Sequence, residues 1–331
     1  MVKKELTVSA DGNGDFRKIQ EAIDIIPLEN AAPVVIRIKN GIYNEKVRIQ
    51  SPYISLIGEN PEKTVLTFND FAKKLFPDGT PMNTFNSYTV YIGGRDFTAE
   101  NITFENSSGM GAVVGQAIAA YVDADRAVFK NCRFLGYQDT LFTGPLPKNP
   151  TPKGLNLVYP TLGSGPNEYS GAIRQYYTDC FIKGDIDFIF GSATAVFNRC
   201  EIFSNRLPDS EPGYITAAST FPNKKYGYVM LDCKLTGDAS PGSVYLGRPW
   251  RDFANVVWIN CWMGAHIHPE AWHNWDLPER QKTVTYREYH SHGPGSAVTQ
   301  RVNWAQQLTS EEAKEYTIPK IFFSPDGWYP K

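Results

Sequence analysis

A short segment centred on cysteine recurs five times and limits the possible folds more than any other feature. Each copy has a large apolar residue three positions before the cysteine and another two positions after it. A polar residue, usually Asn or Asp, precedes the cysteine. The copies are Phe129–Phe134, Tyr177–Ile182, Phe197–Ile202, Met230–Leu235 and Trp258–Met263, and Ala99–Phe104 matches with Ile102 in the cysteine position. Short strands that recur with Asn and Gly at the corners predict a solenoid, in which each unit buries its face on the next.

The spacing of the repeats places two aspartates side by side. Asp139 and Asp187 each lie seven residues after a cysteine, Cys132 and Cys180. Residues 145–172 are rich in Pro, Gly, Ser and Asn, which predicts a protruding loop. Without these 28 residues the spacing between the two cysteines falls from 48 to 20, which is the spacing from Cys180 to Cys200. We therefore predict that the aspartates lie on neighbouring strands, about 4.8 Å apart.

Both ends of the chain differ from the repeats. We expect residues 5–28 to form a strand and a short helix, capped by Asp15 and stopped at Pro27, that covers the open end of the solenoid. The predicted apolar face of this helix is Phe16, Ile19, Ala22, Ile23 and Ile26. We assign residues 33–275 to the solenoid, with Val34–Ile38 and Ile54–Gly58 as its first strands. Residues 276–331 form a tail, with a helix start near Leu308, that packs back on the same single domain.

Composition excludes several classes of function. The chain has 331 residues and a net charge of -2 with no basic run, which argues against a nucleic-acid partner. No stretch approaches the roughly 20 apolar residues of a membrane span. Five cysteines without metal-ligand spacing predict buried thiols rather than a disulfide framework or a metal site. His266 and His268 have no third ligand at a persuasive spacing, so we expect them to be structural or on the surface.

The beginning of the chain bears on its location. The segment Met1–Val8 is basic but lacks the apolar core of a signal peptide. We therefore expect a cytoplasmic protein if the chain is complete, and a secreted one if the chain is a processed mature form.

Four segments carry the groups that ester chemistry needs. They are Gly115-Gln116, Tyr137-Gln138-Asp139, Asp187–Gly191 and Leu246–Trp250. Together they supply two carboxylates, two amides, a guanidinium and an indole. One carboxylate can attack an ester carbonyl while the other donates and then accepts a proton. Amides can hold an oxyanion, and an indole can stack on a sugar ring.

These segments resemble those of the pectin methylesterases (pectinesterases). The most specific stretch is residues 174–191, and the similarity extends from residues 6–16 and 40–46 to the tail at 293–295 and 326–330. The resemblance implies a right-handed parallel β-helix of the pectin-lyase-like, all-β class. It also implies hydrolysis of galacturonate methyl esters in pectin, with no metal or organic cofactor.

The resemblance assigns a role to each of these residues. Asp187 would be the nucleophile and Asp139 the general acid and then base. Gln116 and Gln138 would form the oxyanion hole. Arg248 would orient Asp187 and keep it ionised, and Trp250 would line the sugar cleft.

Three further positions are interpreted separately. Phe188 and Phe190 alternate with Ile189, so we assign the two phenylalanines to substrate binding, with one face of this strand in the core and the other lining the cleft. Asp185 occupies a position where the family more often has a neutral residue, and on a regular strand it would share the face of Asp187. The 145–172 loop is long compared with many relatives, and we expect it to form a wall of the cleft.

Two alternatives remain beside the esterase. One is a β-helix polygalacturonan lyase or glycosidase, which would cut the polymer. The other is a β-helix that only binds sugar, because an aspartate in a solenoid corner is usually a turn residue. No Gly-x-Ser-x-Gly segment is present, which argues against a serine hydrolase of the α/β class. We expect pectin or methylated oligogalacturonides as partners, no membrane or nucleic acid, and a monomer.

Overall fold

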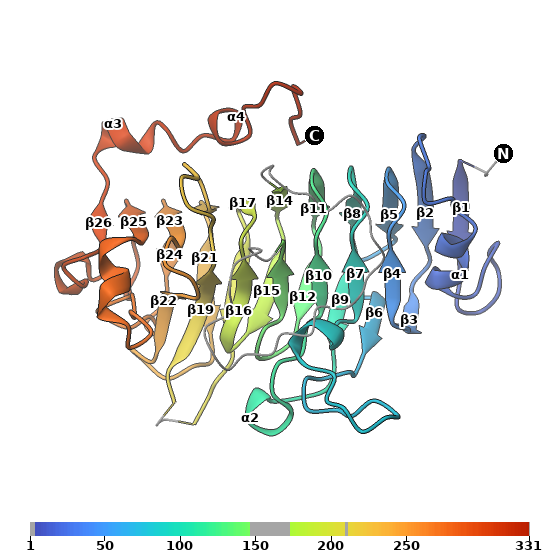
Figure 1. The fold of residues 1–331 in the computed structure, drawn as a ribbon, viewed down its shortest axis with the longest axis horizontal. Helices are drawn as coiled ribbons and strands as arrows, with labels where there is room; N and C mark the ends of the chain where they lie inside the picture. Colours follow the sequence, from blue (N-terminus) through green and yellow to red (C-terminus); the bar gives the residue numbers. More distant parts are fainter. Residues whose placement is uncertain (1–3, 146–172, 209–210, 331) are drawn as a thin grey trace.

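The strands of the protein form three parallel sheets that wind around a common axis (Figure 1). The computed structural model describes residues 4–145, 173–208 and 211–330. The chain passes through the three sheets in turn, so each complete turn of the backbone, which we call a coil, adds one strand to each sheet, while the turns at the two ends are incomplete. Crossovers between parallel strands are right-handed in nearly all proteins. The architecture is the predicted right-handed parallel β-helix.

Each sheet is a ladder of strands in coil order. Sheet A contains β1 (Glu5–Val8), β2 (Val34–Ile38), β5 (Ile54–Gly58), β8 (Thr98–Glu100), β11 (Ala127–Lys130), β14 (Arg174–Thr178), β17 (Thr194–Asn198), β20 (Tyr228–Leu231), β23 (Asn255–Ile259), β25 (Thr285–Tyr289) and β26 (Gln306–Gln307). Sheet B contains β3 (Gly41–Asn44), β6 (Thr64–Phe68), β9 (Thr103–Asn106), β12 (Arg133–Leu135), β15 (Phe181–Gly184), β18 (Glu201–Ser204), β21 (Lys234–Gly237) and β24 (Trp262–Met263). Sheet C contains β4 (Val47–Ile49), β7 (Val90–Ile92), β10 (Ala120–Val122), β13 (Leu141–Thr143), β16 (Ile186–Gly191), β19 (Gly213–Ala218) and β22 (Val244–Pro249).

The five cysteines form a ladder at the corner between sheets A and B. All five are buried and none is in a disulfide, as predicted. Each Sγ donates to the carbonyl two residues earlier. The residue before each cysteine has φ between 48° and 56°, a region that Asn and Asp tolerate better than most residues. This backbone requirement explains why four of the five cysteines follow Asn or Asp.

The predicted N-terminal helix is present but is capped differently. Helix α1 (Ile19–Asp24) lies at the β1 end of the solenoid and buries Ile19, Ala22 and Ile23 (Figure 1). The prediction that Asp15 caps it is wrong, because Asp15 accepts from the backbone N–H of Thr7. Instead, the Glu45 carboxylate accepts from the backbone N–H groups of Ile19 and Gln20. The cap therefore comes from the end of β3, 26 residues away.

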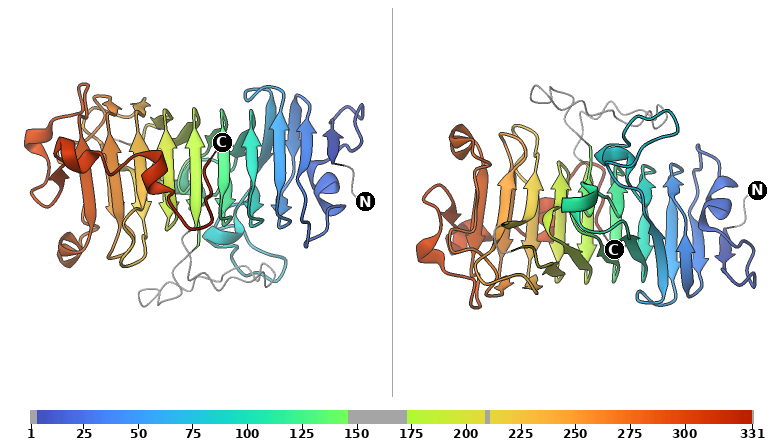
Figure 2. Two further views of the ribbon diagram at one scale, coloured as in Figure 1. Left: turned by 90° about the horizontal axis from the view of Figure 1, so that it is seen from above. Right: turned by 90° about the horizontal axis from the view of Figure 1, so that it is seen from below.

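The C-terminal tail packs back on the solenoid, as predicted, and it covers the outer face of sheet A. Its helices are α3 (Ser310–Ala313), which begins with a capping box at Thr309, and α4 (Ile318–Ile321). Leu308, Tyr316 and Phe322 join an apolar cluster with valines of sheet A. Figure 2 shows the tail running back over the strands toward β11. Although the cysteine repeat fades after Trp275, β25 and β26 still extend sheet A.

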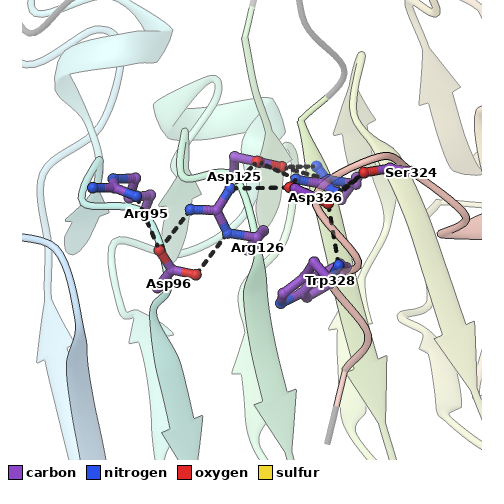
Figure 3. Close-up of polar contacts among 8 residues, drawn as sticks. Arg95, Asp96, Asp125, Arg126, Ser324, Asp326 and Trp328 are labelled. Carbon is purple, nitrogen blue, oxygen red and sulfur yellow. Dashed lines mark hydrogen bonds and ion pairs between the residues drawn. The ribbon is translucent and has the colours of Figure 1, made fainter. Parts of the chain in front are cut away.

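The end of the tail is fastened by a charge cluster, which we call the clasp (Figure 3). The Arg174 guanidinium donates to Asp125 and to Asp326, with N–O distances of 2.7 and 2.6 Å. Arg126 binds Asp96 with two bonds of 2.6 Å and also reaches Asp326. The clasp therefore joins the tail to two successive corners of the solenoid.

Shorter elements project on the side opposite the tail. They are α2 (Gly111–Val114) and the 3₁₀ turn Thr84–Asn86, while the turns Pro278–Lys282 and Val298–Gln300 lie near the end of the solenoid. No helix in the described ranges is long and apolar enough to cross a membrane. All but the first residue of the predicted 145–172 loop lies outside the described residues.

Candidate active site

Asp139 and Asp187 lie on neighbouring coils at the start of two paired strands of sheet C. Strand β13 pairs with β16 so that Leu141 is opposite Ile189, which sets the two aspartates opposite each other. The backbone N–H of Asp139 donates to the carbonyl of Ile186 at 3.0 Å. The prediction that the aspartates are one coil apart is confirmed. Both residues are buried, with 7% and 6% of their surface exposed.

Both aspartates have a left-handed backbone, with φ of 64° for Asp139 and 52° for Asp187. This conformation is uncommon for residues other than glycine and is found disproportionately at functional sites. In β16 it coincides with a shift of register against β19, which breaks the alternation of the strand. Phe188 and Ile189 consequently both belong to the interior core. The prediction that Phe188 lines the cleft is therefore wrong, because strict alternation does not hold at this bulge.

Arg248 of β22 holds the Asp187 carboxylate with two parallel hydrogen bonds. Nε donates to Oδ1 at 2.8 Å and Nη2 donates to Oδ2 at 2.7 Å. The guanidinium is itself stacked between two rings, 3.8 Å from the Tyr214 centroid and 3.9 Å from that of Trp275. A planar cation fixed on both faces leaves the carboxylate one orientation, which is the role predicted for Arg248.

The two aspartates differ in electrostatic environment. Burial raises the pKa of Asp139 well above its ordinary value, and the neighbouring charge of Asp187 raises it further. Burial also raises the pKa of Asp187, but the Arg248 guanidinium opposes this effect. Asp139 is therefore the group that holds a proton, and Asp187 the group that is kept ionised.

Asp185 is a third buried carboxylate close to this pair. Its Oδ1 accepts from the backbone N–H of Ile186 at 2.7 Å. Burial raises its pKa to about 6, and its charge adds to the raised pKa of Asp139. Asp185 is thus tied to the local backbone while contributing to the electrostatics of the site.

Two amides lie near Asp139: Gln138 directly precedes it in the sequence, and Gln116 precedes β10 on the neighbouring coil. The backbone N–H of Ala117 donates to the carbonyl of Gln138, so the two glutamines precede neighbouring strands of sheet C. Gly111 of α2 approaches the Gln138 carboxamide so closely that an added Cβ would lie 2.7 Å from it. Neither side-chain amide hydrogen-bonds to another residue in the described part of the chain. Both can therefore donate to a bound group.

Aromatic side chains cover the outer face of sheet C beside the carboxylates. The half-buried Trp250 indole lies 5.7 Å from the Phe190 ring and 6.5 Å from Phe85, with which it is stacked. Phe190 is only 2% exposed, so it supports the indole from beneath. Trp250 and Phe190 therefore both lie on the outer face of sheet C, and their contact with a bound sugar stays a prediction.

A hollow of about 450 Å³ lies near the starts of β19 and β22. Tyr245 and His268 line it together with Glu211 and the 240–243 turn. Tyr245 stacks between Tyr214 and His268, with centroids 5.5 and 4.3 Å away. His266 is buried, and burial lowers its pKa to about 4. No group of three His, Cys, Asp or Glu side chains in the described ranges is arranged to hold a metal ion.

Tyr214, Trp275 and Phe85 are parts of the site that the sequence analysis missed. Tyr214 is the second residue of β19 and lies two residues after Pro212, outside the cysteine repeats. Trp275 lies where the repeat fades, and Phe85 lies in a turn between β6 and β7. No local pattern marks these positions, because the folding of distant segments brings them to the carboxylates.

Comparison with known proteins agrees with this geometry. A family model described as pectinesterase matches residues 5–146 and 166–325. The chain belongs to the pectinesterase family. Pectinesterase 31 of Arabidopsis thaliana is 40% identical over 96% of this chain and 92% of its own length. Other matching plant proteins of this family are longer, and the chain spans about half of their length.

Solved structures of the family share the fold. The pectin methylesterase of carrot superposes with a TM-score of 0.79 at 32% identity, covering 97% of this chain and 93% of the carrot chain. A pectin methylesterase in complex with a hexasaccharide has the same TM-score at 29% identity, covering 100% of this chain and 99% of its own.

Proposed function

We propose that this member of the pectinesterase family hydrolyses the methyl esters of galacturonate units in pectin, releasing methanol and leaving a carboxylate. The observation that carries the proposal is the pairing of Asp187, held ionised by Arg248, with Asp139, whose pKa is raised well above its ordinary value. One carboxylate is prepared to attack and the other to donate a proton. The family relatives and the sugar-bound structure of one of them support the substrate class.

In the first half of the reaction Asp187 is the nucleophile. One of its oxygens forms a bond to the ester carbonyl carbon, and the charge on the carbonyl oxygen is held by the amides of Gln116 and Gln138. The bond from carbon to the methoxy oxygen then breaks. Asp139 gives its proton to that oxygen, so methanol leaves and an acyl-enzyme anhydride remains.

In the second half Asp139, now ionised, accepts a proton from water. The resulting hydroxide adds to the galacturonate carbonyl, and the anhydride bond breaks with its electron pair returning to Asp187. The galacturonic acid product is then released. Asp187 is again ionised and Asp139 again protonated, as at the start of the reaction. The Trp250 indole stacks on a sugar ring and keeps the ester in place. All these groups come from one chain, so we propose that a monomer is active.

The test is methanol release from methyl-esterified pectin by the wild type and by Asp187→Asn. We expect the variant to be inactive while circular dichroism shows a folded protein. Wild-type turnover by the folded variant would refute the assignment. Formation of an unsaturated product or a falling polymer length would instead indicate a lyase or a glycosidase.

A further inference from the structure

A row of outward-facing residues crosses sheet C from one end to the other, one from each strand. Its members, paired in register, are Arg48, Tyr91, Tyr121, Phe142, Phe190, Ala217 and Arg248. The flanking residues of β4, Val47 and Ile49, belong to the interior core, so Arg48 faces outward. The row therefore places a second arginine on the same face as the catalytic carboxylates, six strands from Arg248.

Arg48 differs from Arg248 in having no anionic partner. Its guanidinium makes no hydrogen bond or ion pair with any residue in the ranges 4–145, 173–208 and 211–330. Its Nε is buried without a hydrogen-bond partner. The guanidinium carbon lies over the Tyr91 ring, 5.8 Å from the centroid. A half-buried, oriented cation of this kind has unused donors for a carboxylate.

The nearby charges leave this end of the face cationic. Asp70 is already bound by two lysines, Lys46 at 2.6 Å and Lys74 at 2.7 Å. Glu45 is used by the backbone of α1. At the opposite end of the face, Glu211 lines the hollow beside Tyr245. A bound anion is therefore favoured near β4 rather than near β22.

We propose that Arg48 forms a subsite for a free galacturonate carboxylate of the sugar chain whose methyl ester lies at Asp139 and Asp187. The inference rests on the proposed function. Arg48 lies three strands from β13, which is about 14 Å along the stacking axis at the usual strand spacing. The subsite is therefore reached only by chains that extend several sugars beyond the reacting ester on the β4 side.

The test compares inhibition by fully de-esterified hexagalacturonate in the wild type, Arg48→Gln and Arg95→Gln. Methanol release from a fully methyl-esterified trigalacturonate serves as the assay, because that substrate offers Arg48 no carboxylate. Arg95 is the control: its guanidinium also lies over a tyrosine ring, 5.1 Å from the Tyr53 centroid, but it pairs with Asp96 at 3.6 Å in a corner outside sheet C. We expect the inhibition constant of the hexamer to rise about tenfold in Arg48→Gln only, as for one lost charged hydrogen bond. The rise should shrink in high salt, because salt screens an ion pair that is only partly buried.

Each outcome separates this inference from the function on which it rests. If the wild type releases no methanol, the proposed function fails and the subsite with it. If the wild type is active but Arg48→Gln binds the hexamer as tightly, the subsite alone is refuted. A parallel loss of trimer turnover in Arg48→Gln would also refute it, because that would show a structural role. Arg48→Lys, which keeps the charge, should recover part of the inhibition.

Discussion

Replacing Arg248 by glutamine would remove both hydrogen bonds that hold the Asp187 carboxylate. Those bonds are 2.8 and 2.7 Å long, and Asp187 is only 6% exposed. Removing one partner of a buried ion pair costs about 3–5 kcal/mol, because the remaining charge is left uncompensated. If that cost falls on the reactive ionised state, kcat/KM drops roughly 10²- to 10⁴-fold. Arg248→Lys keeps the charge but loses the planar fork, so we expect a smaller loss of about 10- to 100-fold.

The pH dependence distinguishes this explanation from a general loss of structure. Burial raises the pKa of Asp187 and Arg248 opposes it, so removing the guanidinium raises that pKa further. Asp187 must be ionised to attack. The acidic limb of the kcat/KM profile should therefore move to higher pH in Arg248→Gln and less in Arg248→Lys.

The assay is methanol release across a pH series, with thermal melting to confirm folding. Adding Arg248→Gln to Asp187→Asn should cost little further stability, because the charge that the guanidinium compensates is already gone. Wild-type kcat/KM with an unmoved acidic limb in the folded Arg248→Gln variant would show that the guanidinium does not control Asp187.

Three further predictions concern other polar groups. Asp139→Asn should be inactive in methanol release, because the proton donor is lost. Burial raises the folded-state pKa of Asp139, so the stability that this group contributes is full at low pH and is lost as the pH rises. The variant should therefore melt at a higher temperature than the wild type at neutral to alkaline pH. Gln138→Ala should lower kcat about 10²- to 10³-fold with little change in KM, as for a lost oxyanion donor, and an unchanged kcat would contradict that role. Asp123, whose Oδ1 is buried without a partner, has its pKa raised by burial to about 7. Wild-type stability should fall relative to Asp123→Asn as the pH rises from about 4 to 7, by up to about 4 kcal/mol, and parallel melting curves across that range would refute this.

The repeat and the carboxylate pair could be predicted because local rules govern them. Each coil needs a left-handed residue before its buried corner, and this need appears in the sequence as Asn131, Asp179 or Asp232 before a cysteine. Counting from these corners placed Asp139 beside Asp187 even though a long insertion separates them. The fold class and the carboxylates could thus be predicted from patterns that span only a few residues.

The errors arise where the local rule is broken or where distant segments meet. Strict alternation predicts that Phe188 lines the cleft, but the left-handed backbone of Asp187 turns Phe188 into the core. The cap of α1 comes from Glu45 rather than Asp15 because the β3–β4 corner happens to reach the helix. The stacking of Tyr214 and Trp275 on Arg248 depends on segments 34 and 27 residues from it, so no periodicity could indicate it.

The clasp has a consequence for how the solenoid folds. In a repeat protein each coil touches only its neighbours, so terminal coils can unravel one at a time. The bonds from Arg174 and Arg126 to Asp326 join residues 152 and 200 positions apart. Closing such long loops is slow, so the tail should dock last in folding. Once docked, it ties the final coils to the middle of the molecule, and the chain should unfold in one cooperative transition rather than fray from its C-terminal end.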